Sequence, residues 1–316
     1  MKILVTGGLG FIGHNVVRIL ESFRHDVAII DNKTTYGVIP QAELDYLMLE
    51  RLCRIKTRDI CIASIEKPFD DSIFEGVDVV IHLASFPRQK VVNKNPTLGS
   101  KVMSEGLLNL LELSVKHKVK KFVYVSSSMV YGNFNTQQSI EGIDEISDCK
   151  PLGQYGIMKL AGEWLVQDYS RQNKLDYTIV RPSAVYGPYD VEDRVISKFM
   201  SQAMRGEELV VNGANDSLDF TYIDDAAMGI ALSAISENTK NAVYNIAKGQ
   251  AYTLLDTAKM IVAIVGQGNI KIENRDNSFP VRGQLNILRA KSDFGFYPVV
   301  DLETGLKEYY DWLKNV

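Results

Sequence analysis

A tyrosine and a lysine four residues apart, in QYGIMK (Gln154 to Lys159), have a spacing that suggests chemistry. Tyr155 and Lys159 lie at the start of a predicted helix, where positions i and i+4 share one face. A free tyrosine has a pKa of about 10, but a nearby ammonium favours the phenolate, so Tyr155 could act as a base near neutral pH. Ser127, in SSSMVYG, could donate a hydrogen bond to the same substrate oxygen. The group suits removal of a hydroxyl proton while the adjoining carbon loses hydride.

A YxxxK pattern also occurs by chance on solvated helices, so its meaning depends on a hydride acceptor nearby. The stretch TGGLGFIG (Thr6 to Gly13) follows an apolar strand and opens a helix. Gly7 would permit the tight turn, Gly10 would let a pyrophosphate approach the backbone, and Gly13 would let helix and strand pack closely. The helix N-terminus would supply free N–H groups to the phosphates. The context predicts a dinucleotide site; the alternative is a glycine turn that binds no ligand.

An acid at the end of the second predicted strand indicates which dinucleotide is bound. Asp31 follows DVAII (Asp26 to Ile30). Its carboxylate can accept hydrogen bonds from both ribose hydroxyls and would repel a 2′-phosphate, which favours NAD over NADP. Lys33 keeps the alternative open, because a nearby cation could offset that repulsion.

These groups need a frame, and the chain supplies one by alternating apolar runs of strand length with segments of helical period. The predicted strands are Lys2 to Thr6, Asp26 to Ile30, Asp78 to Ala84, Lys121 to Ser126 and Tyr177 to Arg181. The predicted helices are Phe11 to Phe23, roughly Thr97 to Lys116, and roughly Tyr155 to Gln172. Repeated units of this kind predict an α/β fold with a parallel sheet between helices. After about Gly187 the pattern becomes irregular, which predicts a smaller substrate region without a flexible linker.

The composition excludes several classes of protein. The chain has 316 residues, of which 46% are hydrophobic and 23% charged, enough for a core without disulfides or metals. The net charge of −4 argues against nucleic acid as a partner. The basic run KHKVKK (Lys116 to Lys121) is interpreted as a solvated helix end rather than a phosphate-binding patch. The chain has three cysteines, Cys53, Cys61 and Cys149, and none of them forms a CxxC pair. This pattern predicts a reduced, cytoplasmic protein without a metal site. No apolar run reaches membrane-spanning length, so no membrane partner is expected.

Nearly end to end, the sequence resembles the extended short-chain dehydrogenase/reductases, in the branch of NAD-dependent nucleotide-sugar epimerases and dehydratases that includes UDP-glucose 4-epimerase. The motifs that carry the resemblance are TGGLGFIG, Asp31-Asn32, Asp59-Ile60, HLAS (His82 to Ser85), SSSMVYG, YGIMK, RPSAVYGP (Arg181 to Pro188), LDFTYIDD (Leu218 to Asp225) and YNIAKG (Tyr244 to Gly249). The resemblance implies a Rossmann-type doubly wound parallel sheet over residues 1–186. It implies a smaller C-terminal α/β substrate-binding region over residues 187–316, with some segments returning to the first domain.

The resemblance also implies roles for individual residues. Tyr155 would be the base, Lys159 would lower its pKa and bind the nicotinamide ribose, and Ser127, four residues before Tyr131, would be the catalytic serine. His82, which ends a buried strand, is interpreted as structural. The implied cofactor-binding residues are Gly7, Gly10, Phe11, Ile12, Gly13, Asp31, Asn32, Lys33, Asp59, Ile60, Leu83, Ala84, Ser85, Tyr155 and Lys159, with Asp59 and Ile60 beside the adenine.

Four chemistries share a site of this kind. A 4-epimerase needs no further group, because the hydride taken from C4 returns to the other face of the sugar. The 4,6-dehydratases of the family usually carry Asp-Glu after the catalytic Ser or Thr, where this chain has Ser128 and Met129, so dehydration ranks low. Net redox by a 4-dehydrogenase or 4-ketoreductase would use the same residues and stays open. A decarboxylase would need additional acid and arginine groups that have no assigned position. A non-catalytic NAD-binding scaffold would have no need for Ser127, Tyr155 and Lys159 together.

The chain departs from the family where substrate is bound. Leu218 replaces an arginine of the RDFxxxDD motif, which helps to hold the diphosphate in relatives, and Ala184 replaces an asparagine of the NVYGP motif. Arg194 and Arg282 are candidates to hold the diphosphate instead, with surface charge as the alternative for each. The candidate substrate-binding residues are Phe86, Arg88, Ser127, Ser128, Tyr155, Arg194 and Arg282, with Arg88 or Lys90 nearer the sugar.

A homodimer is expected, mainly by resemblance, because the two long helices after the fourth and fifth strands of relatives pair across a two-fold axis. The first of these helices carries apolar residues at Leu98, Val102, Leu108, Leu111 and Val115. The alternative is that this stripe faces only its own sheet. The expected setting is nucleotide-sugar supply for a surface polysaccharide or another glycan.

Overall fold

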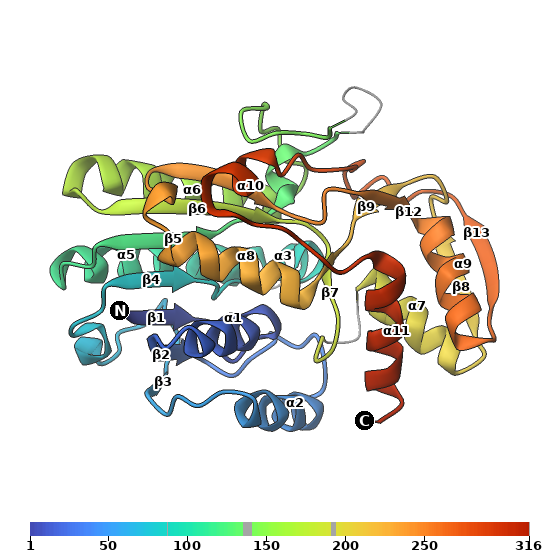
Figure 1. Ribbon diagram of the computed structural model, residues 1–316, viewed down its shortest axis with the longest axis horizontal. Coiled ribbons are helices and arrows are strands. Elements are labelled where there is room, and N and C mark those ends of the chain that lie inside the picture. The colour runs from blue at the N-terminus through green and yellow to red at the C-terminus, as the bar shows by residue number, and fades with distance from the viewer. Residues whose placement is uncertain (87, 135–140, 191–193, 316) are drawn as a thin grey trace.

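The centre of the molecule is a seven-stranded sheet in the order β11-β6-β5-β4-β1-β2-β3, in which every neighbouring pair is parallel (Figure 1). The computed structural model describes residues 1–86, 88–134, 141–190 and 194–315. The strands are β1 (Lys2–Thr6), β2 (Asp26–Asp31), β3 (Ile60–Ile62), β4 (Val79–His82), β5 (Lys121–Val125), β6 (Asp176–Pro182) and β11 (Ala242–Ile246). This is the predicted doubly wound sheet. The strands β2 and β3 are added on one side of β1 and the later strands on the other, so the order of strands reverses between β1 and β4.

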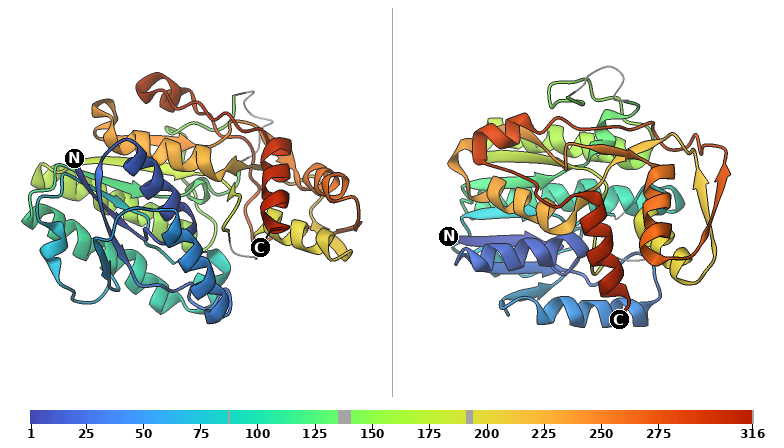
Figure 2. Two further views of the ribbon diagram at one scale, coloured as in Figure 1. Left: turned by 60° about the horizontal axis from the view of Figure 1, so that its bottom comes forward. Right: turned by 45° about the vertical axis from the view of Figure 1, so that its right-hand side comes forward.

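The sheet separates two hydrophobic cores because successive side chains of a strand point to opposite faces. On β1, Ile3 and Val5 enter one core and Leu4 enters the other. The first core also receives side chains from α1 (Phe11–Ser22), α2 (Gln41–Cys53), α8 (Ile223–Ile235) and α10 (Leu288–Phe294). The second receives them mainly from α3 (Gln89–Lys94), α5 (Gly106–Lys116) and α6 (Gln154–Asn173). Figure 2 shows the sheet between these two helical layers.

The predicted helix near Thr97 to Lys116 is present but is not uniform. It begins as α4 (Pro96–Ser100), continues through a π-helical turn at Lys101–Glu105, and ends as α5. Within its apolar stripe, Val102 and Leu111 are buried in the core of their own chain. Part of the stripe therefore packs on its own sheet. Leu98, Leu108 and Val115 remain partly exposed.

The interpretation of KHKVKK as a solvated helix end is wrong for its last residue. Lys116 ends α5 and is exposed, but Lys121 opens β5 and is buried. The Lys121 ammonium donates hydrogen bonds to the carbonyl oxygens of Ser233 and Ser236, both at 2.8 Å, and to the Thr239 hydroxyl at 2.5 Å. A cation at this position caps the carbonyl end of α8, where the helix dipole is negative. Burial lowers the pKa of Lys121 to about 8.

The C-terminal region is built from helices and two-stranded pairs around a third core. Its helices are α7 (Val195–Met204), α9 (Leu254–Val265) and α11 (Leu302–Leu313). Its pairs are β7 (Val185–Tyr186) with β10 (Thr221–Tyr222), β8 (Glu208–Asn212) with β13 (Asn269–Glu273), and β9 (Ser217–Asp219) with β12 (Ala251–Thr253). It lies beside one end of the sheet (Figures 1 and 2). No helix in the described ranges is long and apolar enough to cross a membrane.

Candidate active site

A cavity of about 680 Å³ lies between the carboxyl ends of the parallel strands and the C-terminal region. The glycine loop after β1, Asp31 at the end of β2 and the serine run after β5 line it from the sheet side. Arg194 and Arg282 line it from the other side. Its position at the reversal of strand order is the usual ligand site of an open α/β sheet.

Two glycines of the loop have no room for a side chain. Gly7 has φ +71°, and a Cβ there would lie 2.8 Å from the backbone nitrogen of Ala84. A Cβ on Gly13 would lie 2.0 Å from the carbonyl oxygen of Gly7. These contacts agree with the turn predicted at Gly7 and the close packing predicted at Gly13. The helix α1 begins directly after Gly10 with no side-chain cap, so its N-terminal N–H groups can serve phosphates, and the loop fits a dinucleotide.

Asp31 reaches the cavity with its carboxylate already oriented by the backbone. It accepts hydrogen bonds from the Leu9 N–H at 3.0 Å and the Lys33 N–H at 2.7 Å. Burial raises the pKa of Asp31, and these two bonds oppose that rise. Each carboxylate oxygen keeps a further lone pair for a ribose hydroxyl. Lys33 itself is not among the cavity-lining residues; its backbone N–H binds Asp31, and its charge also opposes the rise in the pKa of that carboxyl.

Arg51 is a cavity-lining residue that sequence reasoning missed. It projects from α2, which was not predicted, and its side chain is 2% exposed. Its guanidinium donates to the carbonyl oxygens of Leu9 at 3.2 Å and Tyr189 at 2.7 Å. It therefore ties the glycine loop to the loop after β7. Nothing in the local sequence of α2 distinguishes it from a surface arginine.

The structure does not bring Asp59 and Ile60 to the cavity. Asp59 precedes β3 at the amino edge of the sheet, and its carboxylate lies 3.7 Å from the Lys2 ammonium. The strand β3 runs from Ile60 toward the carboxyl edge of the sheet. The residues that reach the cavity therefore follow it, and they are Ala63 and Ile65. The two residues expected beside the adenine therefore lie outside the cavity.

Tyr155 and Lys159 both line the cavity from the first turns of α6. The Lys159 Nζ lies 5.9 Å from the centroid of the Tyr155 ring and donates to the Val125 carbonyl oxygen at 2.8 Å. The Ser127 hydroxyl is hydrogen-bonded to Tyr155 and accepts from the Met129 N–H at 3.2 Å. The three residues expected to act together therefore lie together.

The electrostatics of Tyr155 differ from expectation. Burial raises its pKa, and the effects that oppose the rise come from Arg194, the Ser127 hydrogen bond and Arg88. Lys159 is absent from these causes; its own pKa is lowered by burial to about 7 and raised in part by Glu163. In the protein alone, the cations that favour the phenolate are thus two arginines first considered for substrate contact.

Most of the remaining predicted site residues line the cavity, and His82 lies outside it. Those that line the cavity are Gly7, Gly10, Phe11, Ile12, Gly13, Asn32, Leu83, Ala84, Ser85, Phe86, Arg88, Ser128 and Lys90. His82 does not line it: it is buried, its Nδ1 lies 2.8 Å from the Thr6 hydroxyl, and burial lowers its pKa to about 3. This agrees with a structural role.

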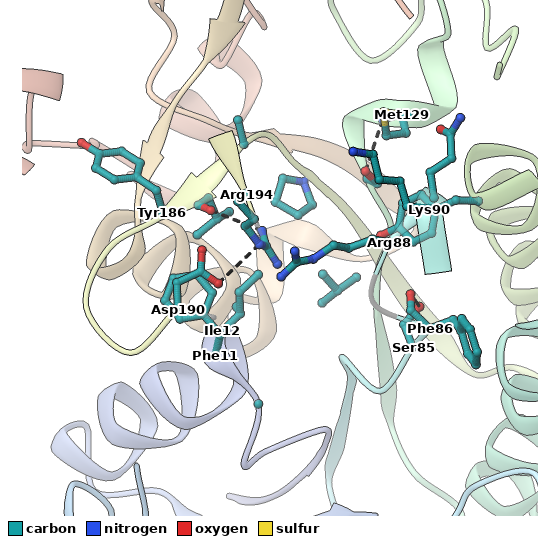
Figure 3. A pocket seen from close by; sticks show the side chains of 18 of the residues that line it. Phe11, Ile12, Ser85, Phe86, Arg88, Lys90, Met129, Tyr186, Asp190 and Arg194 are labelled. Atoms are coloured by element: carbon teal, nitrogen blue, oxygen red, sulfur yellow. Dashed lines mark hydrogen bonds and ion pairs between the residues drawn. The ribbon is translucent and has the colours of Figure 1, made fainter. Parts of the chain in front are cut away.

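Cationic side chains surround the rest of the cavity: Arg88, Lys90, Arg194, Lys198 and Arg282. Arg194 lies with its Nε 3.4 Å from Asp190 and its guanidinium carbon 5.6 Å from the Phe11 ring centroid. Figure 3 shows Arg88 and Arg194 pointing toward one another across the cavity. Lys90 lies 5.6 Å from the centroid of another aromatic ring, that of Phe279.

Arg282, which is half-buried, has the most unusual surroundings of these cations. Desolvation by the surrounding protein lowers its pKa to about 10, and no carboxylate among the described residues pairs with it. A desolvated guanidinium is stabilised by an anion that takes the place of water. Arg282 is therefore placed to receive an anionic group inside the cavity.

Comparison with known proteins identifies the class. The profile of the NAD dependent epimerase/dehydratase family matches residues 3–247, and the chain belongs to that family. NAD is its cofactor, as predicted, and the predicted fold and enzyme class are confirmed.

Individual relatives are similar over their whole length. A putative UDP-glucose 4-epimerase of Methanocaldococcus jannaschii is 32% identical over 99% of this chain and 98% of its own. A dTDP-glucose 4,6-dehydratase of Streptomyces niveus is 28% identical over 100% of this chain and 93% of its own. Among solved structures, UDP-glucuronic acid 4-epimerase from Bacillus cereus, in complex with UDP-glucuronic acid and NAD, superposes with a TM-score of 0.90 at 27% identity, covering 100% of this chain and 99% of its own.

Proposed function

We propose that the protein is an NAD-dependent UDP-sugar 4-epimerase. The observation that carries the proposal is the convergence of Tyr155, Ser127 and Lys159 on the cavity that also contains the glycine loop. The positions after the catalytic serine, Ser128 and Met129, supply no carboxylate for elimination of water. Dehydratases among the relatives therefore indicate common ancestry rather than common chemistry.

The residues of the chain account for the proton half of such a reaction. NAD, when bound, supplies the reversible hydride acceptor. The Tyr155 phenolate would take the proton of the C4 hydroxyl as C4 loses hydride, and the Ser127 hydroxyl would donate a hydrogen bond to the same oxygen. The ketone would then turn within the cavity, and Tyr155 would return the proton after hydride reaches the opposite face. Lys159 would hold the nicotinamide ribose, while Arg194 and Arg88 favour the Tyr155 phenolate.

The charges of the cavity support an anionic substrate. Arg282 is placed to receive one phosphate of the diphosphate, in the role of the family arginine that Leu218 replaces. Arg88 and Arg194 both act on Tyr155, so an anion between them would lie near the reacting carbon. A uronic acid carries its carboxylate on C5, the ring carbon next to C4. Within the UDP-sugars, this geometry favours UDP-glucuronate over UDP-glucose.

A homodimer and a cytoplasmic setting complete the proposal. On α6, the side chains of Ile157 and Trp164 are 53% and 62% exposed, and α5 beside it presents Leu108 and Val115 in part. An exposed apolar face of this kind suits pairing with a second copy. Light scattering should give twice the mass of the chain for the native protein and the mass of one chain for Trp164→Glu.

The direct test is NMR of the purified protein with UDP-glucuronate, UDP-glucose and UDP-galactose, without added cofactor. We expect the C4 epimer of UDP-glucuronate to accumulate to equilibrium while the bound NAD stays oxidised. Stoichiometric reduction of bound NAD, without an epimer, would instead establish the 4-dehydrogenase reaction. No change in any of the three sugars, by protein that retains NAD, would refute the proposal.

A further inference from the structure

A buried ion pair lies beneath the proposed catalytic residues, outside the cavity that would hold the substrate. Glu163 and Arg181 form an ion pair in which the two side chains are 1% and 5% exposed. The Arg181 Nη2 and Nε donate to the two oxygens of Glu163 at 2.6 and 3.0 Å. The Ser126 hydroxyl donates to the same carboxylate at 2.5 Å.

This set touches the active site at two points. Ser126 precedes Ser127, and its backbone N–H donates to the Val180 carbonyl oxygen at 2.8 Å, so both its backbone and its side chain are fixed. Glu163 follows Lys159 by four residues on α6, so the two side chains share one face of the helix. Glu163 is the charged group that supports the protonated form of Lys159.

The surroundings leave Glu163 as the main source of negative charge at this depth. The titratable groups of neighbouring elements that interact with Lys159 or with the pair are Tyr124 on β5, His82 on β4, Tyr155 on α6, Tyr177 on β6, Tyr131 and Cys149. Arg181 also donates to the backbone carbonyl oxygen of Glu145, at 3.3 Å. Burial raises the pKa of Tyr124 and lowers that of His82, so both stay neutral near pH 7.

A buried ion pair is seldom needed for stability alone, because apolar residues of similar volume often serve as well. We propose that Glu163, held by Arg181, is a positioning residue of the reaction: through Ser126 it fixes the Ser127 hydroxyl beside Tyr155. The role of Tyr155 as the base in this inference rests on the proposed function. Glu163 acts only through these neighbours.

The test replaces the pair without leaving an unpaired charge. In Glu163→Met/Arg181→Met the Ser126–Ser127 segment loses its anchor, so the Ser127 hydrogen bond that lowers the pKa of Tyr155 should weaken, and Tyr155 should ionise at higher pH. The pKa of Tyr155 can be read from the ultraviolet absorbance of ionised tyrosine, as the difference between each protein and the same protein carrying Tyr155→Phe. We expect a rise of about half a pH unit or more, with retained NAD, and about a tenfold loss of kcat near neutral pH.

Two further variants keep the result interpretable. Glu163→Gln preserves the shape of the side chain but weakens the hydrogen bond that Ser126 donates to it, so it should raise the pKa of Tyr155 even if the double variant fails to fold. Glu112→Gln removes a carboxylate from the exposed side of α5 and should leave the titration unchanged. An unchanged Tyr155 titration in both folded Glu163 variants would overturn the inference. A shifted titration in a protein that epimerises no sugar would uphold the inference and reject the proposed function.

Discussion

The two sides of the cavity satisfy their polar groups in different ways. On the sheet side, protein atoms meet the buried polar groups: backbone N–H groups bind Asp31, and His14 lies between the Gly10 carbonyl oxygen and the Arg54 guanidinium. On the C-terminal side, Arg282 is desolvated and no carboxylate among the described residues balances it. The first side is held mainly by hydrogen bonds within the protein, whereas the second gains most from an anionic ligand.

This difference separates folding from binding. Substitutions on the sheet side should disturb the protein itself, because they break internal hydrogen bonds. Substitutions of the cations on the other side should leave the fold intact and weaken substrate binding. Tyr155 lies where the two sides meet, so its substitution should affect neither folding nor cofactor binding but only turnover.

The largest effect is expected for Tyr155→Phe. Loss of the proton acceptor should lower kcat about a thousandfold, since positioned acid–base groups typically contribute about 10²–10⁴-fold. Thermal unfolding and the NAD content of the purified protein should stay as in the native chain. Tyr169→Phe, farther along the same helix, is the matched control and should keep native activity. Substantial residual turnover by Tyr155→Phe would mean that another group is the base.

The sheet side should be sensitive to acid through His14. Its Nδ1–H donates to the Gly10 carbonyl oxygen at 2.9 Å and its Nε2 accepts from Arg54 at 3.1 Å, which only the neutral ring can do. Burial lowers the pKa of His14 from 6.5 to about 3. Between these two pKa values the unfolded chain binds the additional proton, so stability rises with pH in this window and is lost as pH falls.

The size of this effect can be isolated with His14→Gln, which keeps a donor and an acceptor. From about pH 7 to about pH 4.5 the native protein should lose about 2–3 kcal/mol more free energy of unfolding than the variant. Urea unfolding at the two pH values measures this difference. Equal losses in both proteins would show that His14 does not carry the acid response.

On the other side of the cavity, Arg282→Met should weaken UDP-sugar binding about 10–100-fold, as expected for loss of a charge-assisted hydrogen bond. Calorimetry with UDP alone separates the diphosphate contact from contacts to the sugar. Because the substitution removes a desolvated charge that has no carboxylate partner among the described residues, the melting temperature should stay level or rise. A large fall in melting temperature with unchanged affinity would place Arg282 among structural arginines such as Arg181.

A smaller effect is expected for Asp31→Asn, which keeps the acceptor oxygen but removes the charge. The fraction of purified protein that retains NAD should fall, with affinity about tenfold weaker. Affinity for NADP should fall less, because the repulsion of a 2′-phosphate is removed. Equal losses for the two cofactors would argue against a ribose contact.

Sequence reasoning succeeded where a local pattern determines the geometry. The glycine loop, the strand ends and the Tyr–Lys spacing each specify a backbone conformation within a few residues, and the structure brings them to one cavity. It failed where position depends on distant packing. Lys121 resembles a solvated lysine until α8 covers it, and Arg51 resembles a surface residue until the loop after β7 reaches it.

The error at Asp59 has a different origin. The family motif predicts the contact at Asp59-Ile60, but β3 begins at Ile60, so the side chains that reach the carboxyl edge come later. The extent of the strand, rather than the motif, decides which residues line the cavity. Arg88 and Arg194 were placed with the substrate, and their effect on Tyr155 could be found only from the folded geometry.

The strand β11 has a consequence for the order in which the chain can fold during synthesis. It covers the outer edge of β6, yet roughly 60 residues of the C-terminal region separate it from that strand. Until those residues leave the ribosome, β6 presents an unpaired edge that another chain could occupy. Lys121 likewise lacks the carbonyl oxygens of Ser233 and Ser236. A nascent chain that already contains Ser127, Tyr155 and Lys159 is therefore still an aggregation hazard, and slow translation before residue 242 should lower the yield of soluble protein.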